Sequence, residues 1–230
     1  MRNFRKVPVY FAVFAVSFLL CLFLSFSVDK NYANLKIKLE KEANATVNTK
    51  VNSMILKINT YRKYNDEESV KGIVHDTLIR NSDSENEYIW INEIVNWNGG
   101  DNYAFRFVNP NFPETEGEMI STTLKDIPRC HPYLAELEGI KKNGEIYYQF
   151  YFKNYLNNDI EVKYSYAKLY KDYNWIIGCG IPESDLFEDA TFTFKKEKQM
   201  LYLFYLILAL LDIFICFIIY NRNKRIEQKL

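Results

Sequence analysis

The chain has 230 residues, of which 48% are hydrophobic and 25% are charged, and its 29 basic side chains are balanced by 29 acidic ones. This balance excludes the strongly basic surface typical of a nucleic-acid-binding protein, so we expect no nucleic-acid partner. Two histidines and four cysteines leave little material for a multi-histidine or paired-cysteine metal site. We therefore expect neither a metal nor a cofactor.

Two apolar runs indicate a membrane protein. Residues 7–28 contain no charged side chain, and residues 200–220 contain only Asp212. At about 1.5 Å per residue each run spans the roughly 30 Å of a bilayer core, so they are predicted as the first and second transmembrane helices. The first run is longer than the apolar part of a signal peptide and lacks a small-residue cleavage motif, which favours an uncleaved anchor.

Basic residues flank both runs on their outer ends. Arg2, Arg5 and Lys6 precede the first run, and four further basic residues lie in the tail 221–230. Short basic flanks stay on the cytoplasmic side, which predicts that both termini are cytoplasmic and that residues 29–199 lie outside the membrane. The two tails are too short to form a domain. We expect the chain to be truncated before a cytoplasmic output domain, because its charged ending is compatible with a helix that continues.

Helical periodicity follows the first apolar run. From residue 29 to 62 the apolar residues recur at steps of four and three, which predicts one face of a long helix. The stripe consists of Leu35, Leu39, Ala43, Val47, Val51, Met54, Ile58 and Tyr61. A second helix is predicted over 67–80, with Asp66 as its N-cap.

After residue 86 the sequence changes to aromatic and β-branched runs that are separated by turn residues. Strands are predicted at 87–94, 103–109, 145–153, 160–169 and 174–181. Turn sequences at 98–101, 143–144 and 157–159 favour an antiparallel sheet over parallel strands with helical crossovers. The proline-containing stretch 110–131 is expected to fold irregularly over one face of the sheet. A short helix is predicted from Pro132 to Ile140, and another runs from residue 183 into the second apolar run.

Three segments resemble a known family. YIWINEI (88–94), FRFVNPNFPETEGEMISTTLKD (105–126) and KYSYAKLYKDYNWIIGCGIP (163–182) resemble a single Cache sensor domain, more closely the version found in Firmicutes signalling proteins. The resemblance implies an α+β fold with a PAS-like five-stranded antiparallel sheet, a long N-terminal helix on one face and a small-ligand pocket on the other. It also implies a non-enzymatic sensor of small organic acids or other metabolites that signals to a diguanylate cyclase, histidine kinase or chemoreceptor domain.

Individual residues match the family pattern. Trp90 corresponds to the aromatic residue of its W-I-N segment, and Lys163 and Tyr166 correspond to K-x-S/T-Y. Trp175, Gly178 and Gly180 correspond to the W-x-x-G-x-G strand. Asn109 departs from the pattern, since it stands where the family has a histidine before proline, so the ligand or its pH response is expected to differ here.

Charged residues in the predicted strands point to an anionic ligand. Arg106 lies mid-strand, and a buried guanidinium needs a carboxylate, which is either a ligand or an internal Asp or Glu. A buried Lys163 ammonium would need a carboxylate partner for the same reason. Strict alternation puts Lys163 and Tyr166 on opposite faces of one strand. Arg106 and Asn109 are also three residues apart and fall on opposite faces. Each pair therefore shares a pocket only if a bulge intervenes.

The predicted ligand-binding residues combine cations with aromatic side chains that carry polar groups. They are Trp90, Arg106, Asn109, Tyr148, Lys163, Tyr164 and Tyr166. The ligand is expected to be a small carboxylate, and no residue is predicted to be catalytic. The alternative is a membrane-anchored interaction protein with a filled core and no ligand. A cavity of roughly 300 Å³ or more with a converging Arg or Lys would separate the two hypotheses.

Three features leave alternatives open. Cys130 and Cys179 both fall outside the membrane, where a disulfide could join them. Asp212 requires a polar partner within the membrane, which is Tyr202, Tyr205 or Asp212 of a second copy. The long stripe from Leu35 onwards extends farther than one sheet face requires, which predicts a homodimer along the first helix. Cover by the exit helix 183–199 of the same chain is the alternative.

Overall fold

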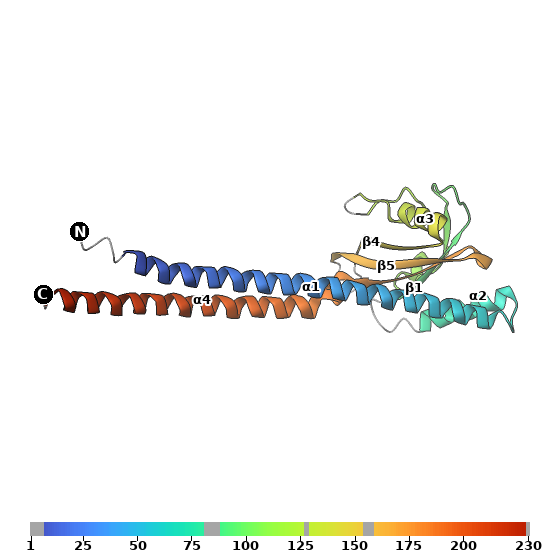
Figure 1. Cartoon of the computed structure of the whole chain (residues 1–230). Helices are drawn as coiled ribbons and strands as arrows, with labels where there is room; N and C mark the ends of the chain where they lie inside the picture. Colours follow the sequence, from blue (N-terminus) through green and yellow to red (C-terminus); the bar gives the residue numbers. More distant parts are fainter. Residues whose placement is uncertain (1–6, 81–87, 127–128, 154–158, 229–230) are drawn as a thin grey trace. The chain divides into compact units, whose positions relative to one another are not determined.

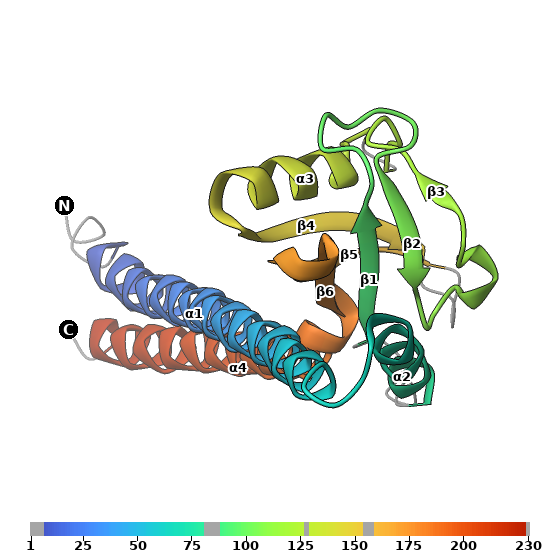
Figure 2. The same ribbon diagram turned by 90° about the vertical axis from the view of Figure 1, so that its right-hand side faces the viewer.

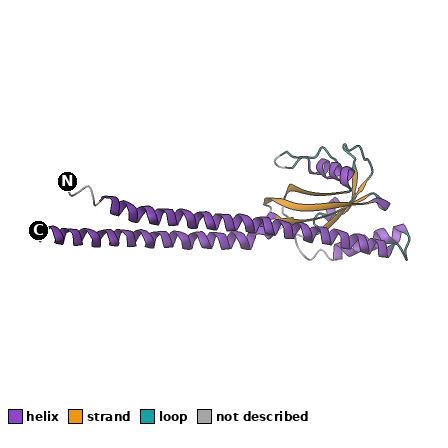
Figure 3. Ribbon diagram, viewed as in Figure 1, coloured by secondary structure: helices purple, strands orange, loops and turns teal. Residues whose placement is uncertain are grey.

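The computed structural model describes residues 7–80, 88–126, 129–153 and 159–228. The chain divides into two compact units, one formed by residues 1–37 with 189–230 and the other by residues 38–188. The helices are α1 (Val7–Tyr61), α2 (Glu67–Arg80), α3 (Pro132–Asn143) and α4 (Glu183–Glu227) (Figure 1). The strands are β1 (Ile89–Ile94), β2 (Ala104–Val108), β3 (Met119–Ile120), β4 (Glu145–Lys153), β5 (Ile160–Tyr170) and β6 (Trp175–Pro182) (Figure 3).

The described strands form one antiparallel sheet in the order β3-β2-β1-β6-β5-β4. The prediction of an α+β fold with a long N-terminal helix is confirmed, but the prediction of five strands is wrong, since the described sheet has six. The additional strand, β3, lies inside the stretch 110–131 that was expected to be irregular. It has two residues, which is too short for an alternating pattern to show in the sequence.

Turns and caps account for the element boundaries. The side chain of Asp66 accepts a hydrogen bond of 2.8 Å from the backbone N–H of Ser69, which confirms the predicted N-cap of α2. Gly144 ends α3 with φ of +76°, a left-handed conformation that costs glycine little. The turn predicted at 157–159 falls largely on residues 154–158, which lie outside the described residues.

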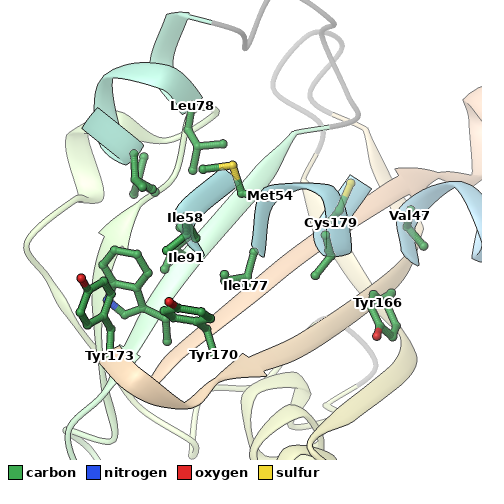
Figure 4. Packing of buried hydrophobic residues seen from close by; sticks show 14 of the residues in the cluster. Val47, Met54, Ile58, Leu78, Ile91, Tyr166, Tyr170, Tyr173, Ile177 and Cys179 are labelled. Carbon is green, nitrogen blue, oxygen red and sulfur yellow. The ribbon is translucent and has the colours of Figure 1, made fainter. Parts of the chain in front are cut away.

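One face of the sheet carries a filled apolar core under α1 and α2. The α1 residues that face the sheet, between Ala43 and Ile58, are at most 4% exposed (Figure 4). They pack against strand residues that include Ile91, Ile177 and Cys179. Most of the stripe seen in the sequence is therefore covered by the sheet of the same chain, whereas Leu35 remains 38% exposed.

The opposite face carries α3 (Figure 2). Leu137 and Ile140 of this helix are buried against residues of β1, β2, β5 and β6, among them Ala104 and Ile176. This second cluster is smaller than the first and occupies only part of the face. The remainder of the face is available for a cavity.

The unit formed by residues 1–37 with 189–230 consists of two helical segments, residues 7–37 of α1 and 189–227 of α4. Both helices are long and apolar enough to cross a membrane. Ser17 donates a hydrogen bond of 3.0 Å to the carboxylate of Asp212, so the aspartate has a partner within the chain that differs from the tyrosines considered from the sequence. Tyr32 stacks on Phe194 with ring centroids 4.1 Å apart, which places the exit helix against this part of α1.

The two outer cysteines are not joined. Cys130 is exposed before α3, whereas Cys179 is fully buried in β6. Within the described residues, therefore, no disulfide links the loop to the sheet.

Candidate functional site

The free part of the α3 face contains a cavity of about 310 Å³ between the sheet, α3 and the loop that follows β2. We call it the α3-side pocket. Its lining includes Trp90 and Asn92 of β1, Arg106 of β2, Tyr148, Phe150 and Phe152 of β4, Tyr133 of α3, and Asn109, Phe112 and Leu124 of the loop. Aromatic walls with a few polar groups are typical of small-molecule sites.

Arg106 is the cation that lines this pocket from β2. Its guanidinium donates a hydrogen bond of 3.2 Å to the hydroxyl of Tyr133. Among the described residues no Asp or Glu forms an ion pair with it, although Asp126 lines the same pocket. Within the described residues, therefore, no internal acid pairs with the guanidinium, which keeps donors for another acceptor.

A bulge in β2 brings Asn109 to the side of Arg106. In the pairing with β1, Ile91 lies opposite Val108 and Asn92 lies opposite Arg106, so Phe107 is the extra residue. Phe107 and Val108 consequently both pack on the α1 side of the sheet, and Asn109 returns to the pocket side. The side-chain oxygen of Asn109 is buried without a hydrogen-bond partner in the described structure.

Lys163 lies behind the aromatic wall of the pocket. Its side chain is fully buried, and its amine has no hydrogen-bond partner among the described residues. The amine lies 3.9 Å from the ring centroid of Tyr88 and 4.7 Å from that of Phe152, two rings that line the pocket. Burial without a counter-ion lowers the pKa of Lys163 to about 7.

The glycines of β6 make room for these groups. A Cβ atom on Gly178 would lie 2.4 Å from the indole of Trp90, and one on Gly180 would lie 2.4 Å from the hydroxyl oxygen of Ser165 and 3.0 Å from the Lys163 side chain. The two glycines of the W-x-x-G-x-G pattern therefore leave room against β6 for the side chains of Trp90, Ser165 and Lys163.

Glu136 of α3 was missed by the sequence analysis. It is fully buried and accepts hydrogen bonds from Tyr148 at 2.7 Å and from Tyr103 at 3.2 Å, and the side chain of Trp90 also bonds to it. Burial raises the pKa of Glu136 to about 6, and the three hydrogen bonds only partly oppose this shift. Its position held a usable signal, since it continues the apolar spacing of Tyr133, Leu137 and Ile140 on one face of α3.

Tyr164 and Tyr166 lie on the other side of the sheet. The register of β5 with β4 and β6 is regular, so no bulge brings them to the face of Lys163. The Tyr166 hydroxyl donates to Glu145 at 2.7 Å, and the Tyr164 hydroxyl donates to Glu40 of α1 at 3.3 Å. Neither residue lines the α3-side pocket, whereas Trp90, Arg106, Asn109 and Tyr148 do.

The sequence matches a family model described as Cache domain over residues 68–187, which is more than half of the chain. The chain belongs to the Cache domain family. Its sheet and its long N-terminal helix are those of a single Cache sensor domain. No curated protein matches the sequence significantly.

Solved structures share the Cache fold. A methyl-accepting chemotaxis protein from Vibrio parahaemolyticus is 16% identical, with a TM-score of 0.56 over 68% of this chain and 99% of that chain. A Cache chemosensory domain solved to explain carboxylic acid recognition is 18% identical, with a TM-score of 0.53 over 66% and 97%. A periplasmic sensor domain of a chemotaxis protein is 13% identical, with a TM-score of 0.50 over 66% and 96%.

Proposed function

We propose that the Cache domain senses a small organic acid outside the cell membrane and signals through its second transmembrane helix to a cytoplasmic output domain. The observation that carries the proposal is Arg106, a guanidinium that faces an aromatic cavity of about 310 Å³ and lacks an internal carboxylate among the described residues. A bidentate pair with a ligand carboxylate satisfies such a group best.

Two further groups support an acidic ligand. The amine of Lys163 and the side-chain oxygen of Asn109 are buried without hydrogen-bond partners in the described structure. A carboxylate in the pocket places a negative charge on the other side of the rings that enclose the amine, and a hydroxyl or amino group on the same ligand supplies a donor for the amide oxygen, which lines the pocket. The relative solved for carboxylic acid recognition by a Cache chemosensory domain is in line with this ligand class.

A cavity with a converging arginine also distinguishes this proposal from its alternative. A membrane-anchored interaction protein without a ligand needs no cavity, and its sheet face is expected to be filled by side chains. The pocket meets the volume of roughly 300 Å³ at which small-molecule sites begin. We therefore favour ligand sensing.

We propose a two-pass arrangement in which residues 7–28 and 200–220 span the membrane and both termini are cytoplasmic, on the basis of the basic flanks. Helix α4 begins at Glu183, directly after the last residue of β6. A shift of β6 on ligand binding would thus pass into α4, and displacements of about 1–2 Å are usual in such switching. A diguanylate cyclase or histidine kinase is the output that we favour.

We further propose a homodimer that pairs along the membrane-proximal part of α1, where Leu35 is exposed. Single cysteines at Leu35 and at the exposed Ile37, which lies on the opposite side of the helix, test this pairing in a background without the native cysteines. Crosslinking at Leu35 that exceeds crosslinking at Ile37 supports the dimer. The absence of crosslinking at Leu35 contradicts it.

Ligand binding is tested with the full chain in detergent by thermal unfolding against acetate, lactate, pyruvate, succinate, malate and citrate. At a hundredfold excess over its dissociation constant, a binding acid should add about 2.7 kcal/mol of stability. Arg106→Ala should abolish the shift, whereas Arg80→Ala, which removes an exposed arginine at the end of α2, should preserve it. A shift that survives in both Arg106→Ala and Lys163→Ala contradicts the proposed site.

The orientation is tested by labelling from outside intact cells. A cysteine in place of the exposed Asn98 should react with an impermeant maleimide, whereas one in place of Gln228 should react only after the cells are permeabilised. Labelling at residue 228 in intact cells contradicts the arrangement.

A further inference from the structure

One wall of the α3-side pocket consists of aromatic rings. Strand β4 contributes Tyr148, Phe150 and Phe152 to this wall, and β1 contributes Tyr88 and Trp90. The ring centroid of Phe150 lies 5.7 Å from that of Tyr148 and 6.4 Å from those of Phe152 and Trp90. Tyr88 extends the row, 5.9 Å from Trp90. Because aromatic rings attract one another at such separations, these five rings form one continuous array, which we call the aromatic wall.

The aromatic wall has apolar surface that the described side chains do not cover. Phe150 and Phe152 are both partly exposed, and neither belongs to the two buried apolar clusters of the domain. Both rings line the cavity of about 310 Å³. An apolar group placed in this cavity would therefore remove aromatic surface from water, which is favourable.

The cation of the pocket lies on a different part of the sheet from the β4 rings. Arg106 belongs to β2, and the sheet order places β1, β6 and β5 between β2 and β4. Neighbouring strands lie about 4.8 Å apart, so a pocket lined by both β2 and β4 extends across the sheet. A two-carbon acid held by Arg106 would consequently cover little of the Phe150 and Phe152 rings. A ligand that contacts both ends of the pocket needs a carboxylate and a larger apolar body.

The other charged side chains of the lining do not favour a second carboxylate. Asp126 is itself negative, and its oxygens accept hydrogen bonds from the backbone N–H groups of Cys130 at 2.7 Å and Tyr151 at 3.3 Å. Lys125 is exposed, so water screens its attraction for an anion. The lining therefore suits an acid with one carboxylate better than an acid with two or three.

We propose that the organic acid recognised by the Cache pocket is a monocarboxylic acid that carries an aromatic ring, with its carboxylate on Arg106 and its ring against the aromatic wall. The inference rests on the proposed function and deepens it, since it names the class of acid. Phe150 is the specificity-determining residue, because its ring contacts three other rings of the wall. A ligand ring at this place continues the edge-to-face and offset contacts of the array, which a saturated ring cannot do.

The expected size of the effect follows from the burial of the ligand ring. Burying a group of the size of a phenylalanine side chain should strengthen binding about ten- to a hundredfold. Contacts between aromatic rings should add about two- to tenfold over a saturated ring of the same size.

The test is isothermal titration calorimetry of the full chain in detergent, with the heat of titration into detergent alone subtracted. Three pairs of acids differ within each pair only by a phenyl group, namely acetate and phenylacetate, lactate and 3-phenyllactate, and pyruvate and phenylpyruvate. We expect the phenyl acid to bind at least tenfold more tightly than its parent in at least one pair. Phenylacetate should also bind more tightly than cyclohexylacetate, succinate, malate and citrate.

The outcomes separate this inference from the proposed function. If any acid binds but no phenyl acid binds more tightly than its parent, the inference is overturned and the proposed function stands. A dicarboxylate or tricarboxylate that binds more tightly than every phenyl acid also overturns it, as does equal binding of phenylacetate and cyclohexylacetate. The absence of binding by any acid overturns both proposals.

Variants assign the specificity to the aromatic wall. The measured quantity is the ratio of the dissociation constants of a parent acid and its phenyl counterpart in the same protein. Phe150→Leu should reduce this ratio about three- to tenfold. Tyr147→Leu is the matched control and should keep the wild-type ratio, because Tyr147 lies on the same strand but accepts a hydrogen bond from Asn48 of α1. A ratio that is unchanged in Phe150→Leu contradicts the assignment, and partial loss of folded protein does not alter the ratio.

Discussion

The two faces of the Cache sheet differ in what they bury. On the α1 side, the interior consists of aliphatic and aromatic side chains such as Val51, Ile58 and Ile177, all of which are fully buried. On the α3 side, the interior includes Lys163, Glu136 and a cavity. One face therefore supplies most of the stability of the domain, and the other accepts a stability cost in order to keep polar groups and space available for a ligand.

Strand β5 contributes side chains both to the apolar core under α1 and to the polar interior on the α3 side. Along β5, Tyr166 and Tyr170 point to the α1 side, and Lys163 and Ser165 point to the pocket side. A shift of one residue in this register would exchange the two sets. The filled core under α1 consequently holds in place the residues that line and support the pocket.

The largest expected effect concerns the burial of the Lys163 amine. The unfolded chain binds more protons than the folded one between pH 7 and 10.5, so the free energy of unfolding rises with pH in this window, and the destabilisation is complete below pH 7. Lys163→Met should therefore stabilise the domain by about 2–5 kcal/mol at pH 6 and by much less at pH 10. Thermal unfolding of both chains at the two pH values measures this difference, and a stabilisation that does not depend on pH contradicts the explanation.

The next effect concerns the glycine beneath Trp90. Gly178→Ala places a Cβ atom 2.4 Å from the indole, which should cost about 1–3 kcal/mol of stability and displace Trp90 from the pocket. The matched control is Gly72→Ala in α2, where no atom lies within 4 Å of the added Cβ and helix propensity should improve stability by up to about 1 kcal/mol. Tryptophan fluorescence and thermal unfolding check both variants. Equal effects at the two glycines would show that the close approach is unimportant.

A smaller effect is expected at Glu136. The folded chain binds more protons than the unfolded one between pH 4.5 and 6, so this carboxyl favours folding below pH 4.5 and loses about 2 kcal/mol of that contribution as the pH rises through 6. Glu136→Gln keeps an acceptor for Tyr148 and removes this dependence. We expect the variant to unfold at a higher temperature than the wild type at pH 8 and at a similar temperature at pH 4.5, as measured by circular dichroism. The reverse order at the two pH values contradicts the burial effect.

The last comparison concerns one hydroxyl on each face, and the smallest effect is expected on the α1 side. Tyr166→Phe removes a hydrogen bond to the partly exposed Glu145 and should cost about 0.5–1.5 kcal/mol without changing ligand affinity. Tyr148→Phe removes a donor to the buried Glu136 and should cost about 1–3 kcal/mol and weaken ligand binding. Loss of affinity in Tyr166→Phe would place the site on both faces.

Much of the fold followed from periodicity. The stripe on α1, and the aromatic and β-branched runs between turn residues, predicted the long helix and five of the strands to within a few residues. The two-residue strand β3 escaped because its pairing with β2 depends on tertiary contacts and not on local pattern. The stripe was also assigned in part to a dimer, although the sheet covers it from Ala43 to Ile58.

The pocket could be predicted only in part. The family resemblance singled out Trp90, and residue type singled out Arg106 and Tyr148; all three line the cavity. The bulge at Phe107 that adds Asn109 to them has no local signature, and β5 has no bulge to add Tyr166. Glutamate in an amphipathic helix is usually exposed, so Glu136 was overlooked on the apolar face of α3.

The bond between Ser17 and Asp212 also has a consequence for biogenesis. An aspartate at the centre of a transmembrane helix raises the free energy of insertion by about 2.5–3.5 kcal/mol. In the proposed two-pass arrangement, the ribosome delivers α1 before α4, so Ser17 would already be in the bilayer when Asp212 arrives and would offer it a hydrogen-bond donor. Efficient integration of the second helix would then depend on the first, and we expect a chain whose leading helix is replaced by a purely aliphatic segment to leave α4 outside the lipid more often.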